Sequence, residues 1–155
     1  MAVDVGEKIP DFTLADDTGK PVSLSSFAGS RLIMFFYPKA MTPGCTTEAC
    51  DFRDNYDGFL EAGFAVVGVS PDPPAANARF KEKEGLKFPL LSDEDHSLAG
   101  QLGAWGVKKN YGKEYEGLIR STFVVGPQGT LEVAYRNVRA TGHVARVVRE
   151  LLEVD

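Results

Sequence analysis

The chain has 155 residues, the usual size of one domain, and its 43% hydrophobic and 25% charged residues are typical of a globular protein. Seventeen Lys and Arg against 22 Asp and Glu leave a net charge of -5, which argues against nucleic acid and anionic membrane surfaces as partners. The longest apolar run, residues 32–37, is far shorter than the ~20 residues that cross a bilayer, and the first residues lack the basic and apolar regions of a signal peptide. We therefore expect one domain, residues 1–155, in the cytoplasm.

The first segments predict a small hairpin followed by a buried strand. Phe12 and Leu14 precede the turn-forming residues 17–19, and two further apolar residues follow them, which indicates an N-terminal β-hairpin. The run LIMFFY at residues 32–37 is continuous and ends at Pro38. Such a run is typical of a strand that is buried on both faces inside an α/β sheet.

An amphipathic helix is predicted from Thr42 to about Gly63. Thr42 is a favourable N-cap, Pro43 suits the first helical position, and Gly63 is a favourable C-terminal stop. Its apolar residues recur at helical spacing, at Cys45, Ala49, Phe52, Tyr56, Phe59 and Leu60. A second apolar strand follows at residues 64–70, so strand, helix and strand form a βαβ unit with parallel strands.

The rest of the chain continues the alternation of helices and strands. We predict helices from 72–74 to about Gly85 and from 97 to 102, strands at 88–91, 120–125 and 131–136, an exposed loop at 112–117, and a last helix capped by Thr141. The glycines and proline at 126–129 make the last two strands a hairpin. The expected fold is therefore α/β, with a mixed central β-sheet flanked by helices.

The two cysteines, Cys45 and Cys50, are the candidates for chemistry. Two cysteines cannot form a disulfide framework, and in a reducing compartment such a pair is catalytic or metal-binding more often than structural. If Thr42 is the N-cap, Cys45 is the third helical residue, where unpaired N–H groups and the helix dipole favour a thiolate. A simpler reading is that both are small buried hydrophobic residues.

The spacing of the cysteines limits how they can react with each other. On an intact helix, residues i and i+5 have Cα atoms about 8.6 Å apart, whereas a disulfide requires less than about 7 Å. A bond between Cys45 and Cys50 therefore requires the first helical turns to unwind, and Gly44 makes that opening easier. Zinc is a poor match for this spacing, because His96 and His143 lie in other segments, where we expect surface or cap positions.

Residues 37–50, YPKAMTPGCTTEAC, resemble the active-site segment of the peroxiredoxins. Pro38, Thr42 and Cys45 match the family pattern Pro-x-x-x-Thr-x-x-Cys, and the added Cys50 is similar to the PrxQ or bacterioferritin comigratory protein subgroup. Four further segments agree in order: IPDFTL near the start, LLSDEDH at 90–96, GAWG at 103–106 and RSTFVV from Arg120. The resemblance implies a thioredoxin-like fold and a thiol peroxidase.

The resemblance also implies roles for individual residues. Cys45 would be the peroxidatic cysteine, which attacks hydrogen peroxide or an organic hydroperoxide and becomes a sulfenic acid, and Cys50 would be the resolving cysteine that forms a disulfide with it. Thr42 and Arg120 would assist the reaction, and the implied substrate-binding residues are Pro38, Thr42, Gly44 and Arg120. Thioredoxin or a glutaredoxin-like dithiol would reduce a monomeric enzyme, with no metal or organic cofactor.

Other interpretations remain open at this point. Arg120 could be an ordinary surface residue in an ion pair, and Thr42 could serve as a helix cap. A thioredoxin-like disulfide oxidoreductase is a second enzyme class, although the spacing is C-x4-C instead of C-x-x-C and residues 120–122 are Arg-Ser-Thr where thioredoxins carry Ile-Pro-Thr. A third class is a redox sensor whose helix unfolds on oxidation and exposes Phe52 and Phe59 to a partner.

Overall fold

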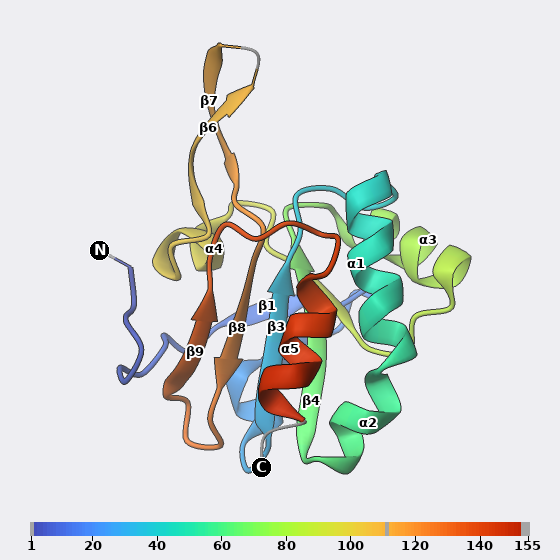
Figure 1. Ribbon diagram of the computed structural model, residues 1–155, viewed down its shortest axis with the longest axis vertical. Coiled ribbons are helices and arrows are strands. Elements are labelled where there is room, and N and C mark those ends of the chain that lie inside the picture. Colours follow the sequence, from blue (N-terminus) through green and yellow to red (C-terminus); the bar gives the residue numbers. More distant parts are fainter. Residues whose placement is uncertain (1, 111, 153–155) are drawn as a thin grey trace.

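The computed structural model describes residues 2–110 and 112–152, and its centre is a seven-stranded mixed sheet (Figure 1). The strand order is β2-β1-β5-β4-β3-β8-β9, with β1 (Thr13–Ala15), β2 (Pro21–Ser23), β3 (Arg31–Phe36), β4 (Phe64–Ser70), β5 (Leu90–Ser92), β8 (Ser121–Val125) and β9 (Leu131–Tyr135). The three middle strands β5, β4 and β3 are parallel, and the outer strands pair antiparallel. The predicted mixed sheet, βαβ unit and N-terminal hairpin are confirmed.

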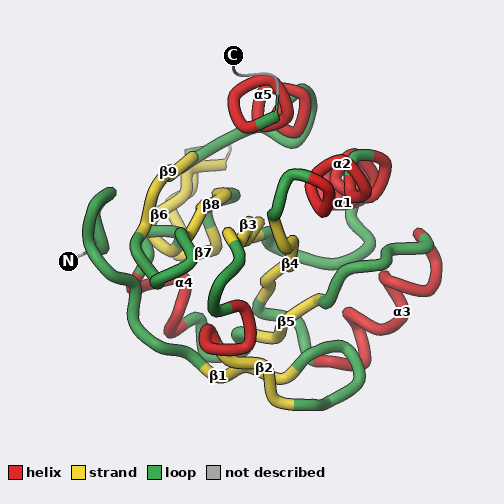
Figure 2. The backbone as a smooth tube through the Cα atoms, turned by 90° about the horizontal axis from the view of Figure 1, so that it is seen from below, coloured by secondary structure: helices red, strands yellow, loops and turns green. Residues whose placement is uncertain are grey.

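Helices cover both faces of this sheet (Figure 2). One face carries α1 (Pro43–Asp54), α2 (Tyr56–Glu61), α3 (Pro74–Glu84) and α5 (His143–Leu151), and the other carries the short 3-10 helix η1 (Leu24–Phe27) and α4 (Ser97–Gln101). Alternate side chains of β3 enter the two cores: Ile33 and Phe35 lie under α1, and Met34 and Phe36 lie in the opposite core. The apolar run at 32–37 is therefore buried on both faces, as predicted.

A two-stranded hairpin projects from the body of the protein (Figure 1). It consists of β6 (Trp105–Asn110) and β7 (Lys113–Leu118), so the predicted exposed loop at 112–117 is wrong. Apart from Leu118 at the base, the described side chains of these strands are exposed or half-buried, and their sequence lacks the alternation of a strand with one buried face. Cross-strand contacts support them instead: Lys109 pairs with Glu114 at 3.6 Å, and the Lys108 ammonium lies 5.9 Å from the centre of the Tyr115 ring.

The helix predicted from Thr42 to Gly63 is divided at Asn55 into α1 and α2. The Asn55 side-chain amide donates to the backbone carbonyl of Asp51 at 2.8 Å, and its own backbone N–H donates to the carbonyl three residues earlier, of Phe52. These local bonds compete with the regular helical pattern. The break lies beyond both cysteines, so Cys45 and Cys50 still share one unbroken helix.

Two predicted boundaries are also displaced. The last helix is capped by Gly142, with a φ of 83°, and not by Thr141, because the chain turns there through a left-handed conformation that suits glycine. The fifth strand begins at Leu90 and not at residue 88, since Pro89 has no N–H to donate to a neighbouring strand.

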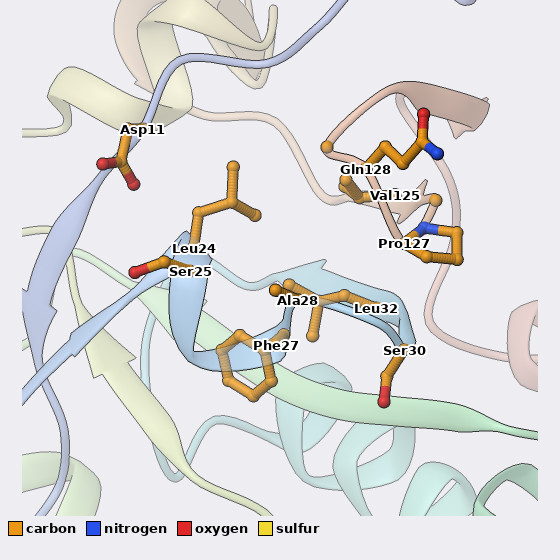
Figure 3. Close-up of a pocket in the computed structure, with 12 residues that line it drawn as sticks. Asp11, Leu24, Ser25, Phe27, Ala28, Ser30, Leu32, Val125, Pro127 and Gln128 are labelled. Atoms are coloured by element: carbon orange, nitrogen blue, oxygen red, sulfur yellow. The ribbon is translucent and has the colours of Figure 1, made fainter.

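A cavity of about 300 Å³ lies beside the start of β3 and the last residue of β8 (Figure 3). Leu24, Phe27 and Pro127 give it a mainly apolar lining. Pro38 follows β3 and Arg120 precedes β8, so both residues lie at the opposite ends of these two strands. The cavity is therefore remote from the cysteines. In the described residues no helix has the length and apolar character that a membrane span requires.

Candidate active site

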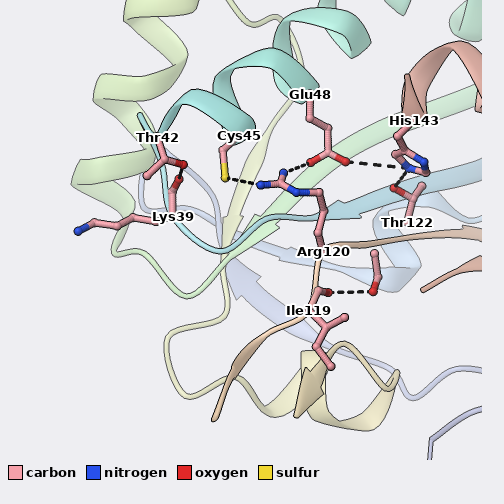
Figure 4. Close-up of polar contacts among 9 residues, drawn as sticks. Lys39, Thr42, Cys45, Glu48, Ile119, Arg120, Thr122 and His143 are labelled. Atoms are coloured by element: carbon pink, nitrogen blue, oxygen red, sulfur yellow. Dashed lines mark hydrogen bonds and ion pairs between the residues drawn. The ribbon is translucent and has the colours of Figure 1, made fainter. Parts of the chain in front are cut away.

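Cys45 lies in the first turn of α1, at the carboxyl end of β3. It is the third residue of the helix, as predicted, and is 1% exposed. Thr42 occupies the N-cap position, but its side chain makes no capping hydrogen bond. Its hydroxyl donates instead to the backbone carbonyl of Lys39 at 2.8 Å (Figure 4). The Thr42 oxygen therefore keeps lone pairs with which it can accept a hydrogen bond from a ligand.

The loop between β3 and α1 is held in place by the segment between β4 and α3 and by α3 itself. The Ala40 backbone N–H donates to the Asp72 carboxylate at 2.7 Å, and the Asp72 backbone N–H donates to the Ser70 hydroxyl at 3.2 Å. Deeper in the core, the Tyr37 hydroxyl donates to the side chain of Asn77 at 2.6 Å. This network fixes the residues that lead into α1, and no motif in the sequence marks it.

Arg120 joins the sheet to the cysteine helix. It immediately precedes β8, and Ser121 of β8 pairs with Phe36 of β3, so the guanidinium lies at the same sheet edge as Cys45. Nη2 donates to the Cys45 sulfur at 3.3 Å, and Nη1 donates to Glu48 Oε1 at 2.6 Å (Figure 4). The side chain is 14% exposed. Arg120 is therefore part of the cysteine site, and the alternative of a plain surface ion pair is wrong.

Glu48, Thr122 and His143 complete the buried polar cluster, and none of the three was predicted from the sequence. His143 Nε2 lies 2.8 Å from the Thr122 hydroxyl and 4.0 Å from Glu48 Oε2. The prediction that His143 is at a surface or cap position is wrong: it is the first residue of α5, with a side chain 1% exposed between the rings of Phe52 and Tyr135. The available signal was Glu48, three residues after Cys45 and hence on the same helix face.

Cys50 lies on α1 away from Arg120. It is half-buried, both cysteines are free thiols, and its sulfur faces Glu84 Oε2 at 3.9 Å. Burial raises the pKa of the Cys50 thiol, and the neighbouring carboxylates add to this effect while Arg53 opposes it. Arg53 also donates to the backbone carbonyl of Glu84 at 2.6 Å. In this conformation Cys50 is therefore a weakly ionised thiol packed against the end of α3.

Comparison with known proteins identifies the family. Residues 5–134 match the AhpC/TSA family. The chain is 46% identical to Peroxiredoxin Bcp of Bacillus subtilis over 155 residues, which covers 100% of this chain and 99% of the relative. It is 45% identical to Peroxiredoxin Bcp of Escherichia coli over 148 residues, or 96% and 95% of the two chains. The chain belongs to the peroxiredoxins.

A solved structure agrees with this assignment. The bacterioferritin comigratory protein of Xanthomonas campestris has a TM-score of 0.88 and 37% identity, and the match covers 96% of this peroxiredoxin and 97% of that chain. The expected thioredoxin-like fold and the resemblance to the PrxQ subgroup are thereby confirmed. The protein is thus a thiol peroxidase of the Bcp/PrxQ kind, an enzyme that reduces peroxides.

Gly44 lets the peroxiredoxin bring Arg120 close to the helix. A Cβ atom at this position would lie 3.2 Å from Arg120 Nη2 and 3.6 Å from the Ala140 side chain. Contacts of 3.2 Å are tight for a real Cβ, so a side chain here would push the guanidinium away from the Cys45 sulfur. Gly44 thus affects the site because its missing side chain leaves room for the Arg120 guanidinium.

A cavity of about 480 Å³ opens beside Arg120 in this peroxiredoxin. The body of the protein and the β6–β7 hairpin both contribute to its lining, which consists of Pro38, Val107, Lys108, Lys109, Ile119, Arg120, Asn137 and Val138. Four of these residues are apolar, so the space suits a molecule with both polar and apolar parts. Across residues 2–110 and 112–152, no group of three or more His, Cys, Asp and Glu side chains could hold a metal ion.

Proposed function

We propose that this peroxiredoxin reduces hydrogen peroxide and organic hydroperoxides through Cys45, and the hydrogen bond from Arg120 to the Cys45 sulfur is the observation that carries the proposal. The Cys45 thiolate attacks one peroxide oxygen in line with the O–O bond. A sulfur–oxygen bond forms, the O–O bond breaks, and the products are a sulfenic acid and a hydroxide or alkoxide that takes up a proton.

Arg120 and Thr42 assist this step electrostatically. The guanidinium stabilises the thiolate before the attack, and its remaining donor capacity stabilises the charge that moves onto the leaving oxygen. The Thr42 hydroxyl, fixed by the Lys39 carbonyl, accepts a hydrogen bond from the peroxide. Pro38 lines the adjoining cavity and shields the sulfur from water.

The cavity beside Arg120 supports organic hydroperoxides as substrates. Its apolar side chains, which include Ile119 and Val138, can contact an alkyl group while the peroxide reaches Arg120. The Xanthomonas campestris relative has alkyl peroxide reduction activity. We expect the same substrate class here, in addition to hydrogen peroxide.

In the second half of the cycle, Cys50 attacks the Cys45 sulfenic acid, releases water and forms an intramolecular disulfide. The two residues lie on the unbroken α1, so this helix must open locally first. Opening also removes Cys50 from Glu84 and so favours its thiolate. Thioredoxin or a glutaredoxin-like dithiol then reduces the disulfide, and because both cysteines belong to one chain, a monomer completes the cycle.

The experiment that tests the function is peroxide consumption with a thioredoxin system. Repeated turnover is expected with hydrogen peroxide and with cumene hydroperoxide. A redox sensor would instead accumulate its oxidised form after one equivalent of peroxide. A disulfide oxidoreductase would reduce insulin disulfides without any peroxide, and either outcome would contradict a peroxidase.

Cys50→Ser is expected to separate the two halves of the cycle. Arg120 contacts Cys45 and not Cys50, so the first oxidation of Cys45 should keep its rate within about twofold, whereas thioredoxin-driven recycling should stop. Rapid-quench mass spectrometry measures the first step, and NADPH oxidation in the coupled assay measures recycling. Unimpaired recycling would remove Cys50 from the proposed role.

Arg53→Ala is expected to speed disulfide formation. Arg53 joins α1 to the last residue of α3 through the Glu84 carbonyl, and losing a hydrogen bond worth about 1 kcal/mol should make opening of α1 about fivefold easier. Alkylation and mass spectrometry at timed intervals follow the Cys45–Cys50 disulfide. Arg79→Ala, an exposed arginine on α3, is the matched control. A disulfide that forms at the same rate in both variants would contradict this role of Arg53.

A further inference from the structure

The guanidinium of Arg120 donates hydrogen bonds to two buried acidic side chains in the active site (Figure 4). Arg120 donates to the Cys45 sulfur at 3.3 Å and to Glu48 Oε1 at 2.6 Å. Cys45 and Glu48 are three residues apart on α1, so their Cβ atoms are about 5–6 Å apart on one face of the helix. Their exposed fractions are 1% and 0%. If both were ionised, two buried negative charges would compete for one positive charge.

The second oxygen of Glu48 faces an imidazole instead of a fixed donor. Among the described residues Glu48 Oε2 has no hydrogen-bond partner, and it lies 4.0 Å from His143 Nε2. That nitrogen is 2.8 Å from the Thr122 hydroxyl. A neutral imidazole can donate from Nε2 to a carboxylate or accept at Nε2 from a carboxylic acid, and the hydroxyl can adapt in the same way. The cluster therefore accommodates Glu48 in either charge state.

The carboxyl of Glu48 titrates near neutral pH because it is buried. Burial raises the pKa of Glu48 to about 7, although Arg120 acts to lower it and Asp51 adds to the rise. Burial lowers the pKa of His143 to about 4, as do the charges of Arg146 and Arg120, with Glu150 opposing them. At neutral pH the imidazole is therefore uncharged. Glu48 is then close to its midpoint, where a change of charge nearby moves its proton.

We propose that Glu48 holds a proton while Cys45 is a thiolate and releases it when Cys45 is oxidised, and that His143 is the positioning residue that holds Glu48 in both states. This inference rests on the proposed peroxidase function. When the thiolate becomes a neutral sulfenic acid, the charge of Arg120 is left to Glu48 alone, and the carboxyl ionises. The proton that Glu48 loses offsets part of the proton uptake by the departing hydroxide or alkoxide. Sulfur supplies the two electrons that reduce the peroxide.

Proton uptake per oxidised Cys45 tests the proposal. A pH-indicator dye in stopped flow follows the protons near pH 7, and a Cys50→Ser background halts the reaction at the sulfenic acid. Adding Glu48→Gln should increase the uptake by up to about half a proton per Cys45, because a group at its midpoint is half protonated. Adding Glu61→Gln instead, at an exposed residue of α2, should leave it unchanged. Equal uptake with and without Glu48 would overturn the proposal.

Infrared spectroscopy provides a second test that keeps Glu48 in place. The reduced Cys50→Ser protein should show the carbonyl band of a buried protonated carboxyl, and one equivalent of peroxide should remove it. His143→Leu takes away the imidazole that can donate to the ionised carboxylate, so the pH midpoint of the band should rise. His143→Asn, whose amide can donate and accept, should restore it towards the original value. A band unaffected by oxidation would refute proton release by Glu48. A midpoint unaffected by either substitution would refute the positioning role of His143.

Mass spectrometry separates this inference from the function on which it rests. If Cys45 is not oxidised by peroxide, the peroxidase function itself fails. The other outcome is that Cys45 is fully converted to sulfenic acid while Glu48→Gln leaves proton uptake unchanged and oxidation leaves the carboxyl band unchanged. The peroxidase function then stands, and the release of a proton by Glu48 is refuted.

Discussion

A Cys45→Ser variant is expected to lose peroxide turnover by at least about 10³-fold. A serine hydroxyl stays protonated at neutral pH, and a neutral hydroxyl is a poor nucleophile towards the O–O bond, so Arg120 and Thr42 would have no anion to direct. Hydrogen peroxide consumption with a thioredoxin system measures the loss. Because the buried sulfur is replaced by a similarly small group, circular dichroism should show an unchanged fold.

The comparison with Cys50→Ser makes this result specific. That variant should still consume one equivalent of peroxide per chain, whereas Cys45→Ser should consume none. Sustained turnover by Cys45→Ser would assign the peroxide chemistry to another group. One equivalent consumed by Cys45→Ser would make Cys50 the residue that reacts first with peroxide.

The central strands and the main helices could be predicted from the sequence because each has a strong local signal. The apolar runs at 32–37 and 64–70 became β3 and β4, and the glycine at the end of α3, Gly85, has the left-handed φ of 64° that a C-terminal stop requires. The β6–β7 hairpin lacked such a signal, since both of its faces are largely exposed and polar. The break at Asn55 is accompanied by local hydrogen bonds of its side chain and backbone, which residue periodicity does not reveal.

The candidate site was predictable only where a motif marks it. Pro38, Thr42 and Cys45 lie in one short segment. The resemblance to the family added Arg120, whose guanidinium donates to the Cys45 sulfur in the structure. His143 lies far along the chain and carries no motif, and its proximity to Glu48 arises because α1 and α5 pack on the same face of the sheet. Tertiary packing, which no local pattern in the sequence reveals, therefore decides this half of the site.

An Arg120→Met variant is expected to oxidise Cys45 about 10²–10³-fold more slowly, because it removes the donor to the thiolate and to the leaving oxygen. Rapid mixing with hydrogen peroxide, followed by mass spectrometry of Cys45, measures this rate. The same change leaves Glu48 buried without its cationic partner. Breaking a buried pair on one side costs about 3–5 kcal/mol of unfolding free energy. A slow rate could therefore reflect a damaged fold instead of lost chemistry.

The pH dependence of stability should reveal the Glu48 contribution to that cost. Without Arg120, burial should hold the pKa of Glu48 even further above its unfolded value of 4.5. At low pH Glu48 is protonated in both the folded and the unfolded protein, so its ionisation costs no stability there. As pH rises above the unfolded pKa, the unfolded state ionises first and stability is lost. Urea unfolding at about pH 5 and about pH 8 should therefore show the larger destabilisation at the higher pH.

A double variant, Arg120→Met with Glu48→Met, separates chemistry from folding. Apolar side chains of similar size in place of both members of a buried pair often restore stability or exceed it, so unfolding free energy should return to near the original value. The Cys45 oxidation rate should stay about 10²-fold or more below that of the unmodified protein, because neither methionine can donate to the sulfur or to the peroxide. Recovery of the rate together with stability would mean that Arg120 acts through the fold. A double variant that is stable but oxidises Cys45 slowly would show that the guanidinium acts in the reaction itself.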